Sequence, residues 1–229
     1  MLRLEDVTPS VKKKSKPKDR QLTVWTVGHS TRPVEEFIEL LRAHDIEQLV
    51  DVRTIPRSRH NPQYGQDQLG PALEASGIHY LHMPGLGGLR HARRDSINSA
   101  WRNASFRGYA DYMQTAAFSD ALNELIGLAR KRRTAIMCAE AVPWRCHRSL
   151  VADALVVRGI AAEEIASPTR TQPHKLTPWA HVEGETITYP GTDAGTDAGL
   201  DAGEDSPAAE SKPAPARRRV SKNLFSQKG

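Results

Sequence analysis

The chain has 229 residues, of which 38% are hydrophobic and 26% are charged, and its formal net charge is +5. This length predicts one domain with additional terminal segments, and the absence of an apolar run of 18 residues excludes a transmembrane helix. The only two cysteines, Cys138 and Cys146, are too few for a disulfide scaffold and fit a reducing compartment. The first 20 residues contain no apolar stretch of signal-peptide length, so we expect a cytoplasmic protein.

Strand-like and helix-like segments alternate along the middle of the chain. Short apolar, β-branched segments predict strands at 22–28, 48–52, 78–83 and 134–138, with a further short strand near 164–165. Apolar residues at helical spacing predict helices at 33–43, at 66–75 with an interruption at Pro71, one or two across 109–133, and one at 146–158. This order favours an α/β fold, in which a single three-layer domain has a mainly parallel sheet covered by helices on both faces.

The two ends of the chain have a different composition. Residues 1–20 are basic, whereas residues 191–229 contain an acidic Gly-Asp-Ala repeat followed by an Ala/Pro-rich basic end. Such segments bury too little apolar surface to offset the entropy of ordering, so we predict disorder for both and a folded domain over 21–190. The basic ends favour contact with nucleic acid, and solubilising arms are an equal alternative.

Polar side chains and glycines follow four of the predicted strands. They are His29, Ser30, Asp51, Arg53, Gly87, Gly88, Cys138 and Glu140. In open α/β sheets, ligands bind outside the carboxyl ends of the strands. We therefore predict one polar cleft at that edge, against the alternative that these residues are caps and loop side chains.

Five motifs carry a family resemblance. In chain order they are TVGHST, DVRTIPRSR, HMPGLGG, FRGYADYM and CAEAVPWRCHRSLVADAL, and together they resemble the domain-of-unknown-function family 488 over about residues 22–190. The resemblance implies a cytoplasmic α/β domain and supplies no established reaction. The positions that match the family are His29, Ser30, Asp51, Arg53, Ser58, Arg59, Gly87, Gly88, Tyr109, Asp111, Cys138, Glu140, Cys146, His147 and Arg148. The chain departs from the family pattern at Val142, where an Asp usually precedes the proline.

Cysteine chemistry is one interpretation of the last motif. Cys146 lies at the start of a predicted helix beside three cationic or titratable side chains, an environment that lowers a thiol pKa and favours a nucleophile. The alternative is a small buried side chain. Cys138 is the second candidate nucleophile. Candidate general acids or bases are His29, Asp51 and Glu140.

Arginines dominate the loops after the second and third strands, and Arg suits bidentate recognition of phosphate. A helix start beside Arg148 would also favour an oxyanion. The predicted ligand-binding residues are Ser30, Arg53, Ser58, Arg59, Gly87, Gly88, Tyr109, His147 and Arg148. No motif for NAD, FAD or ATP is present, so the cofactor stays open. The spacing of the two cysteines is not that of a zinc knuckle, so no metal site is predicted, and a three-ligand catalytic metal is kept as an alternative.

Two functions follow from these observations. The first is a protein that binds a phosphorylated, nucleotide or nucleic-acid-type anion in the cleft, with cysteine-dependent catalysis. The alternative is a non-catalytic nucleic-acid-binding module whose cysteines are structural. The expected partner is an anionic small molecule or a nucleic acid and not a membrane, and the oligomeric state is left open.

Overall fold

The structure is a computed structural model that describes residues 21–191. Its main elements, in chain order, are β1 (Thr23–Gly28), α1 (Val34–Ala43), β2 (Gln48–Asp51), α2 (Gln66–Ala75), β3 (His79–His82), α3 (Ala104–Tyr112), α4 (Ala116–Ala129), β4 (Thr134–Cys138), α5 (Arg148–Val157), β5 (Ala161–Ser167), β6 (Arg170–Pro173), β7 (His181–Glu183) and β8 (Thr186–Thr188). Three 3-10 turns lie between them, η1 (Pro62–Tyr64), η2 (Pro84–Leu86) and η3 (Pro143–Arg145).

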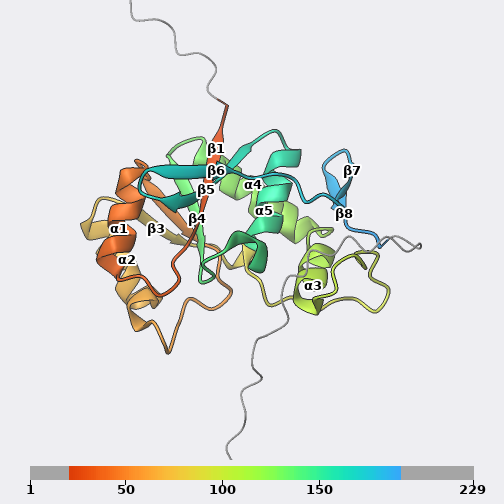
Figure 1. The fold of residues 1–229 in the computed structure, drawn as a ribbon, viewed down its shortest axis with the longest axis horizontal. Coiled ribbons are helices and arrows are strands. Elements are labelled where there is room, and N and C mark those ends of the chain that lie inside the picture. Colours follow the sequence, from red (N-terminus) through yellow and green to blue (C-terminus); the bar gives the residue numbers. More distant parts are fainter. Residues whose placement is uncertain (1–20, 192–229) are drawn as a thin grey trace, which may run out of the picture. The chain divides into compact units, whose positions relative to one another are not determined.

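The predicted α/β fold is confirmed. Six strands form one sheet in the order β3-β2-β4-β1-β5-β6 (Figure 1). The pairs among β1 to β5 are parallel, and β6 runs antiparallel to β5. A separate hairpin joins β7 and β8.

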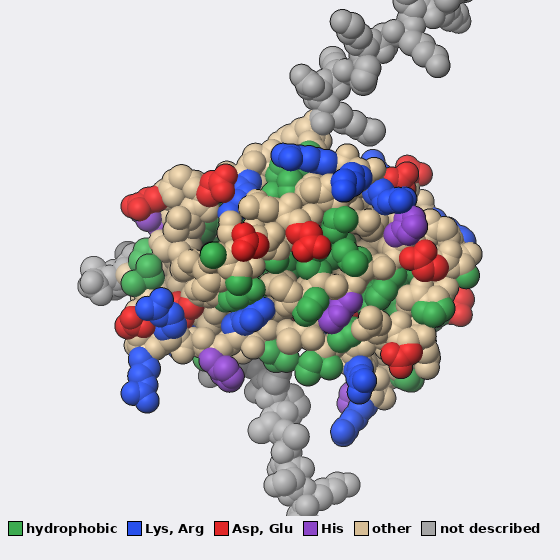
Figure 2. All heavy atoms as spheres, turned by 180° about the vertical axis from the view of Figure 1, so that it is seen from behind, with side chains coloured by type: hydrophobic (Ala, Val, Ile, Leu, Met, Phe, Trp, Pro, Cys, Tyr) green, Lys and Arg blue, Asp and Glu red, His purple; other side chains and the backbone are tan. Residues whose placement is uncertain are grey.

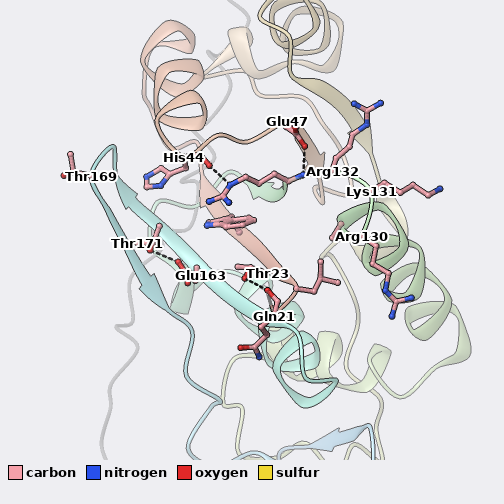
Figure 3. A pocket seen from close by; sticks show the side chains of 14 residues that line it. Gln21, Thr23, His44, Glu47, Arg130, Lys131, Arg132, Glu163, Thr169 and Thr171 are labelled. Atoms are coloured by element: carbon pink, nitrogen blue, oxygen red, sulfur yellow. Dashed lines mark hydrogen bonds between the residues drawn. The ribbon is translucent and has the colours of Figure 1, made fainter. Parts of the chain in front are cut away.

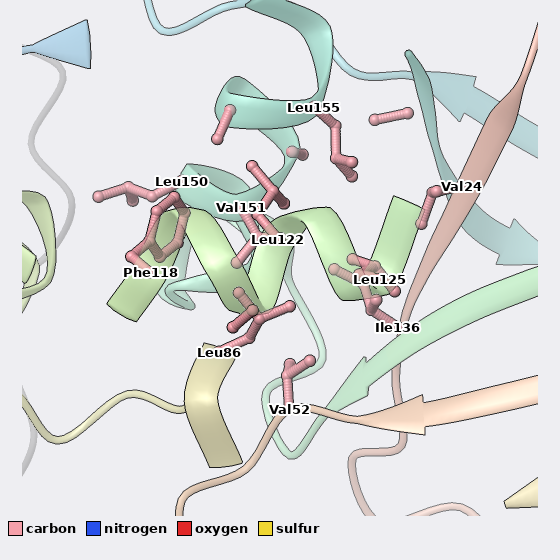
Figure 4. Close-up of a cluster of buried hydrophobic side chains, with 14 of the residues drawn as sticks. Val24, Val52, Leu86, Phe118, Leu122, Leu125, Ile136, Leu150, Val151 and Leu155 are labelled. Carbon is pink, nitrogen blue, oxygen red and sulfur yellow. The ribbon is translucent and has the colours of Figure 1, made fainter. Parts of the chain in front are cut away.

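Each face of the sheet carries its own hydrophobic core, because successive strand residues point to opposite faces. Trp25 and Met137 pack with α1 and α2 on one face. On the other face, Val24 and Ile136 pack with α4 and α5 (Figure 4). The two helix layers predicted from the alternating pattern are therefore both present.

Three helices differ from the predicted boundaries. Asn103 caps α3 by accepting from the backbone N–H groups of Ser105 and Phe106, so this helix starts before the predicted 109. Pro71 does not interrupt α2, because Leu69 and Leu73 anchor the helix in the core on either side of it. The last predicted helix starts at Arg148 rather than at 146.

The strand order places β4 between β2 and β1. The helices that follow β1 and β2 pack on one face of the sheet, and the helix that follows β4 packs on the other. Neighbouring strands whose connections leave to opposite faces define a topological switch point, where α/β sheets bind ligands. The carboxyl end of β4, occupied by Cys138, lies at this point.

No helix within residues 21–191 is long and apolar enough to cross a membrane. The predicted terminal segments, apart from Gly191, lie outside the described residues. The domain boundaries inferred from composition therefore stay a prediction.

Candidate functional site

The pairing of β1 with β4 continues past the ends of both strands. The backbone N–H of His29 donates to the Cys138 carbonyl at 3.0 Å, and the N–H of Ser30 donates to that of Ala139 at 3.0 Å. Gly28 permits this approach, because a Cβ there would overlap the carbonyl oxygen of Glu140 and lie 2.9 Å from Nη1 of Arg148. The glycine of the first motif thus holds the loop after β4 against the end of β1.

A buried ion pair occupies the end of β2. Arg53 donates to the Asp51 carboxylate from Nε at 2.9 Å and from Nη2 at 2.5 Å. The Tyr80 hydroxyl donates to the same carboxylate at 2.7 Å, and Nη2 of Arg53 also donates to the Tyr64 carbonyl. Nη1 of Arg53 lies 3.4 Å from Nε2 of His29, whose ring stacks on that of Tyr64. The predicted Asp51, Arg53 and His29 therefore form one interconnected cluster.

Histidine 29 is held neutral in this cluster. Burial lowers its pKa to about 4, and the nearby positive charge of Arg53 acts in the same direction. Its Nδ1 lies 2.7 Å from the Ser30 carbonyl, which accepts a hydrogen bond and so places the proton on Nδ1. Nε2 is left as the acceptor that faces Arg53. Asp51 also raises the pKa of Arg53 in spite of burial, so the guanidinium stays charged.

A second cluster lies on the other face of the sheet and contains both cysteines. Arg148, which is fully buried, donates from Nη1 to the Cys138 sulfur at 2.7 Å and to the Glu140 carbonyl at 2.6 Å. Its Nη2 donates to the Glu164 carboxylate at 2.9 Å. The Cys146 thiol donates to the Cys138 sulfur at 2.6 Å, and both cysteines are free thiols. This cluster pairs one guanidinium with a carboxylate and a sulfur.

The two thiols have opposite pKa shifts. Burial raises the pKa of Cys138, but the Cys146 hydrogen bond and the charge of Arg148 outweigh burial and lower it. Burial and the neighbouring Cys138 raise the pKa of Cys146 well above its ordinary value. We expected the low-pKa thiol to be Cys146, whereas the directions of the two shifts favour Cys138. The Cys146 sulfur faces Cys138, and α5 begins only two residues after Cys146.

Histidine 147 joins the start of α5 to the end of β2. Its Nε2 lies 3.1 Å from the Val52 carbonyl, and its Nδ1 lies 3.7 Å from the Cys146 sulfur. Burial lowers its pKa to about 4, and the charge of Arg148 adds to the effect. Gly88 leaves room for the ring, since a Cβ there would lie 3.0 Å from Nδ1. The Tyr109 ring packs beside it, 5.0 Å between centroids.

The remaining predicted residues lie on loops, except Asp111, which lies on α3. Arg59 and Glu140 are exposed, and Ser58 accepts from the backbone N–H of Asn61. Gly87 is buried against Thr54. Asp111, which the family resemblance marks, holds a distant loop through Ser96, Asn98 and Arg93. All the predicted roles in catalysis and binding stay predictions.

Sequence reasoning missed Glu164 and did not connect Tyr80 to the ion pair. Glu164 lies on β5, sixteen residues after Arg148, and also accepts from the Thr26 hydroxyl. No local motif signals this contact, because it depends on β5 lying beside β1. Tyr80 lies on β3 and reaches the Asp51 carboxylate only because β3 pairs in parallel with β2.

An open cavity lies at the opposite edge of the sheet, near the amino ends of the strands. It measures about 700 Å³ and is lined by Thr23, His44, Glu47 and Arg132 among others (Figure 3). None of the predicted site residues lines it. Across the described part of the chain, no group of three or more His, Cys, Asp or Glu side chains is placed to hold a metal ion.

Comparison with known proteins gives one match. A family model described as "Domain of unknown function DUF488" matches residues 33–155, more than half of the chain. No curated protein and no solved structure matches the chain. The matched range contains Asp51, Arg53, both cysteines and Arg148, whereas His29 precedes it.

Proposed function

The chain belongs to the DUF488 family of domains of unknown function, and on that premise we propose that it is a cysteine-dependent enzyme. It binds a phosphorylated or nucleotide-type anion at the carboxyl ends of β1, β2 and β4 and attacks it with the Cys138 sulfur. The observation that carries the proposal is the guanidinium of Arg148, 2.7 Å from that sulfur and wholly buried. A fixed cation and a donating thiol beside one sulfur favour the nucleophilic thiolate.

The place of Cys138 in the sheet supports this role. Cys138 is the last residue of β4, which lies between β2 and β1. The helix that follows β4 packs on one face of the sheet, and the helices that follow β1 and β2 pack on the other. Open α/β sheets bind their ligands in the crevice at such a point. Cys146, by contrast, has a raised pKa and serves as the hydrogen-bond donor to the nucleophile.

The positive charge available to an anion comes from exposed arginines rather than from the two buried arginines, Arg53 and Arg148. Asp51 neutralises Arg53, and Glu164 neutralises Arg148. Arg57 and Arg59 in the loop after β2, and Arg145 in the loop after β4, are exposed and form no ion pair with any described residue. These three guanidinium groups supply the planar, bidentate donors that suit a phosphate.

Proton transfer falls to Glu140 in this proposal. Asp51 is fully buried and accepts from Arg53 and Tyr80. The His29 ring is buried, neutral, and bonded at Nδ1. Glu140 is exposed two residues after the nucleophile and lies at the same edge of the sheet. It is the carboxylate that can reach a leaving group, as a general acid must.

The test is a turnover assay on phosphomonoesters and nucleotides with fully reduced protein. We expect phosphate release by the wild type, a loss of at least a hundredfold in Cys138→Ser, and a smaller loss in Cys146→Ser. Rapid quenching should trap a phosphorylated Cys138. If no phosphate ester is turned over and no phosphorylated Cys138 forms, the enzymatic proposal fails.

Binding is tested separately by calorimetric titration of phosphate, pyrophosphate and nucleotides. Charge-assisted hydrogen bonds contribute about 1.5–3 kcal/mol each, so replacing both Arg57 and Arg59 by Ala should weaken binding by at least tenfold. Arg130→Ala, at the opposite edge of the sheet, is the matched control and should bind like the wild type. If wild type binds none of these compounds at millimolar concentration, the anion site is wrong.

The second candidate is a non-catalytic nucleic-acid-binding module. It is favoured by the burial of both thiols, since only 1% of Cys138 and 5% of Cys146 is exposed. Against it, Lys and Arg side chains are interspersed with Asp and Glu side chains over much of the face shown in Figure 2, and the basic side chains gather only near its upper edge. Salt-sensitive binding of generic DNA or RNA, together with thiols inert to alkylation, would favour this module.

A further inference from the structure

We propose that Cys138 and Cys146 are oxidised by a hydroperoxide to a reversible intramolecular disulfide, which makes the site redox-sensitive. The two residues are the only cysteines of the chain, and both are free thiols. The consequence for activity rests on the proposed function, because the disulfide would consume its nucleophile. The oxidation itself depends only on the thiol pair.

The geometry of the pair carries the inference. The two sulfurs lie 2.6 Å apart, about 0.6 Å more than the length of roughly 2.05 Å in a disulfide bond. Cys138 is fixed in the sheet as the last residue of β4, where it pairs in register with Gly28. Cys146 follows the short η3 turn in an extended conformation. The exposed loop between them can absorb the small approach that bond formation needs.

Burial selects the oxidant. Only 1% of Cys138 and 5% of Cys146 is exposed, which favours a small oxidant such as hydrogen peroxide over a bulky peptide disulfide such as glutathione disulfide. Arg148 donates directly to the Cys138 sulfur and is placed to stabilise the oxygen that becomes negative as the peroxide bond breaks.

The reaction balances in two steps. The Cys138 thiolate attacks one peroxide oxygen, an S–O bond forms as the O–O bond breaks, and hydroxide leaves, which gives a sulfenic acid. The Cys146 sulfur then attacks the Cys138 sulfur, the S–S bond forms as the S–O bond breaks, and water leaves with the thiol proton. Overall, two thiols are oxidised and one hydrogen peroxide is reduced to two waters.

The oxidised cluster stays compatible with the fold. Conversion of the Cys138 sulfur to a disulfide leaves Arg148 still bonded to the Glu164 carboxylate and to the Glu140 and Ala141 carbonyls. The buried guanidinium thus keeps an opposite charge in both states, so oxidation does not leave an unpaired buried cation.

The experiment treats the reduced full-length protein with hydrogen peroxide and measures its intact mass and its thiol count under denaturing conditions. We expect both thiols to disappear together, the mass to fall by two hydrogens without dimer formation, and dithiothreitol to restore both. In Cys146→Ser, dimedone should label residue 138. In Cys138→Ser, the remaining thiol should be lost at least tenfold more slowly.

Several results would overturn the proposal. They are retention of both thiols by the wild type, addition of oxygen to one cysteine in place of hydrogen loss, and disulfides that link two chains. These readings use the wild type and do not depend on the folding of a variant. They are also separate from the proposed function, because phosphate-ester turnover is measured on reduced protein and can fail while the disulfide still forms.

Discussion

The buried charges of the site are organised in pairs. Arg53 bonds to Asp51, two residues away, and Arg148 bonds to Glu164, sixteen residues away. Removing one member of a buried pair leaves an uncompensated charge, which costs far more than an exposed ion pair contributes. The exposed arginines of the loops are therefore better probes of ligand binding than the buried ones, whose substitution would also disturb the fold.

Acid should destabilise the protein through His29 and His147. The pKa of each is about 4, whereas the unfolded chain binds the proton near pH 6.5, so stability is complete above pH 6.5 and falls as pH drops toward 4. Between pH 7 and pH 5, each histidine should therefore lower the free energy of unfolding by about 2 kcal/mol. Urea unfolding at the two pH values measures it. His29→Asn should reduce this pH dependence, and His91→Asn, on an exposed loop, should leave it unchanged. If the free energy of unfolding changed equally with pH in the wild type and in both variants, this account would be contradicted.

Glycine 28 should tolerate no side chain. A methyl group there overlaps the Glu140 carbonyl and crowds Arg148, so Gly28→Ala must push the loop after β4 away from β1. Overpacking of this kind costs about 1–3 kcal/mol. Gly127→Ala is the matched control, because its Cβ would meet nothing within 4 Å and the site is helical, where Ala is favoured by up to about 1 kcal/mol. If chemical denaturation gave the two variants equal free energies of unfolding, the close approach of the loop after β4 to β1 would not matter for stability.

At the scale of elements, the sequence predicted what local pattern encodes. Four strands lie within one or two residues of their predicted positions. For β1, β2 and β4 the reason is that β-branched and apolar runs mark buried parallel strands, whereas β3 is partly exposed. The antiparallel β6 and the hairpin of β7 and β8 were not predicted. Their residues are mostly exposed and carry no apolar alternation, so only their tertiary contacts define them.

The segment after β6 is attached to α5 through Asp153. This fully buried carboxylate accepts hydrogen bonds from His174, from the backbone and hydroxyl of Thr177, and from the Tyr189 hydroxyl. Asp153→Ala leaves all of these donors unpaired and should cost about 3–5 kcal/mol. Tyr189→Phe removes one donor and should cost about 1–2 kcal/mol.

Hydrogen exchange shows which part of the chain Asp153→Ala destabilises. In Asp153→Ala, the backbone amides of Thr177 and Tyr189 should lose protection, while those of β1 and β4 keep theirs at the level that the lower global stability allows. A stability within 0.5 kcal/mol of wild type for Asp153→Ala would mean that the segment is held by its apolar contacts alone.

At the scale of the whole molecule, the site depends on strand order, which sequence does not specify. The residues expected at one cleft, among them Asp51 and Cys138, do end neighbouring strands. The pleat nevertheless sends them to opposite faces, into two clusters that meet through the backbone of His29. The recurrence of polar residues at strand ends could thus be read from sequence. The neutralising role of Glu164 could not, because it arises only when β5 packs against β1.

The limits of the folding unit follow from the same contacts. Ile187 and Tyr189 are almost fully buried in the core formed with α4 and α5, and the Tyr189 backbone N–H donates to the Asn98 side chain.

A chain of residues 21–191 keeps these contacts and should melt within a few degrees of the full-length protein. A chain of residues 21–186 loses two buried side chains, of which each contributes about 1.5–3 kcal/mol, together with the hydrogen bonds to Asp153 and Asn98. Since 1 kcal/mol shifts the melting temperature of a domain this size by about 2–4 °C, the shorter chain should melt on the order of 10 °C lower. Scanning calorimetry of the three chains separates the outcomes: a large drop already in the chain of 21–191 would show that the terminal segments stabilise the domain, and an unchanged melting temperature in the chain of 21–186 would show that β8 and Tyr189 are not part of its cooperative core.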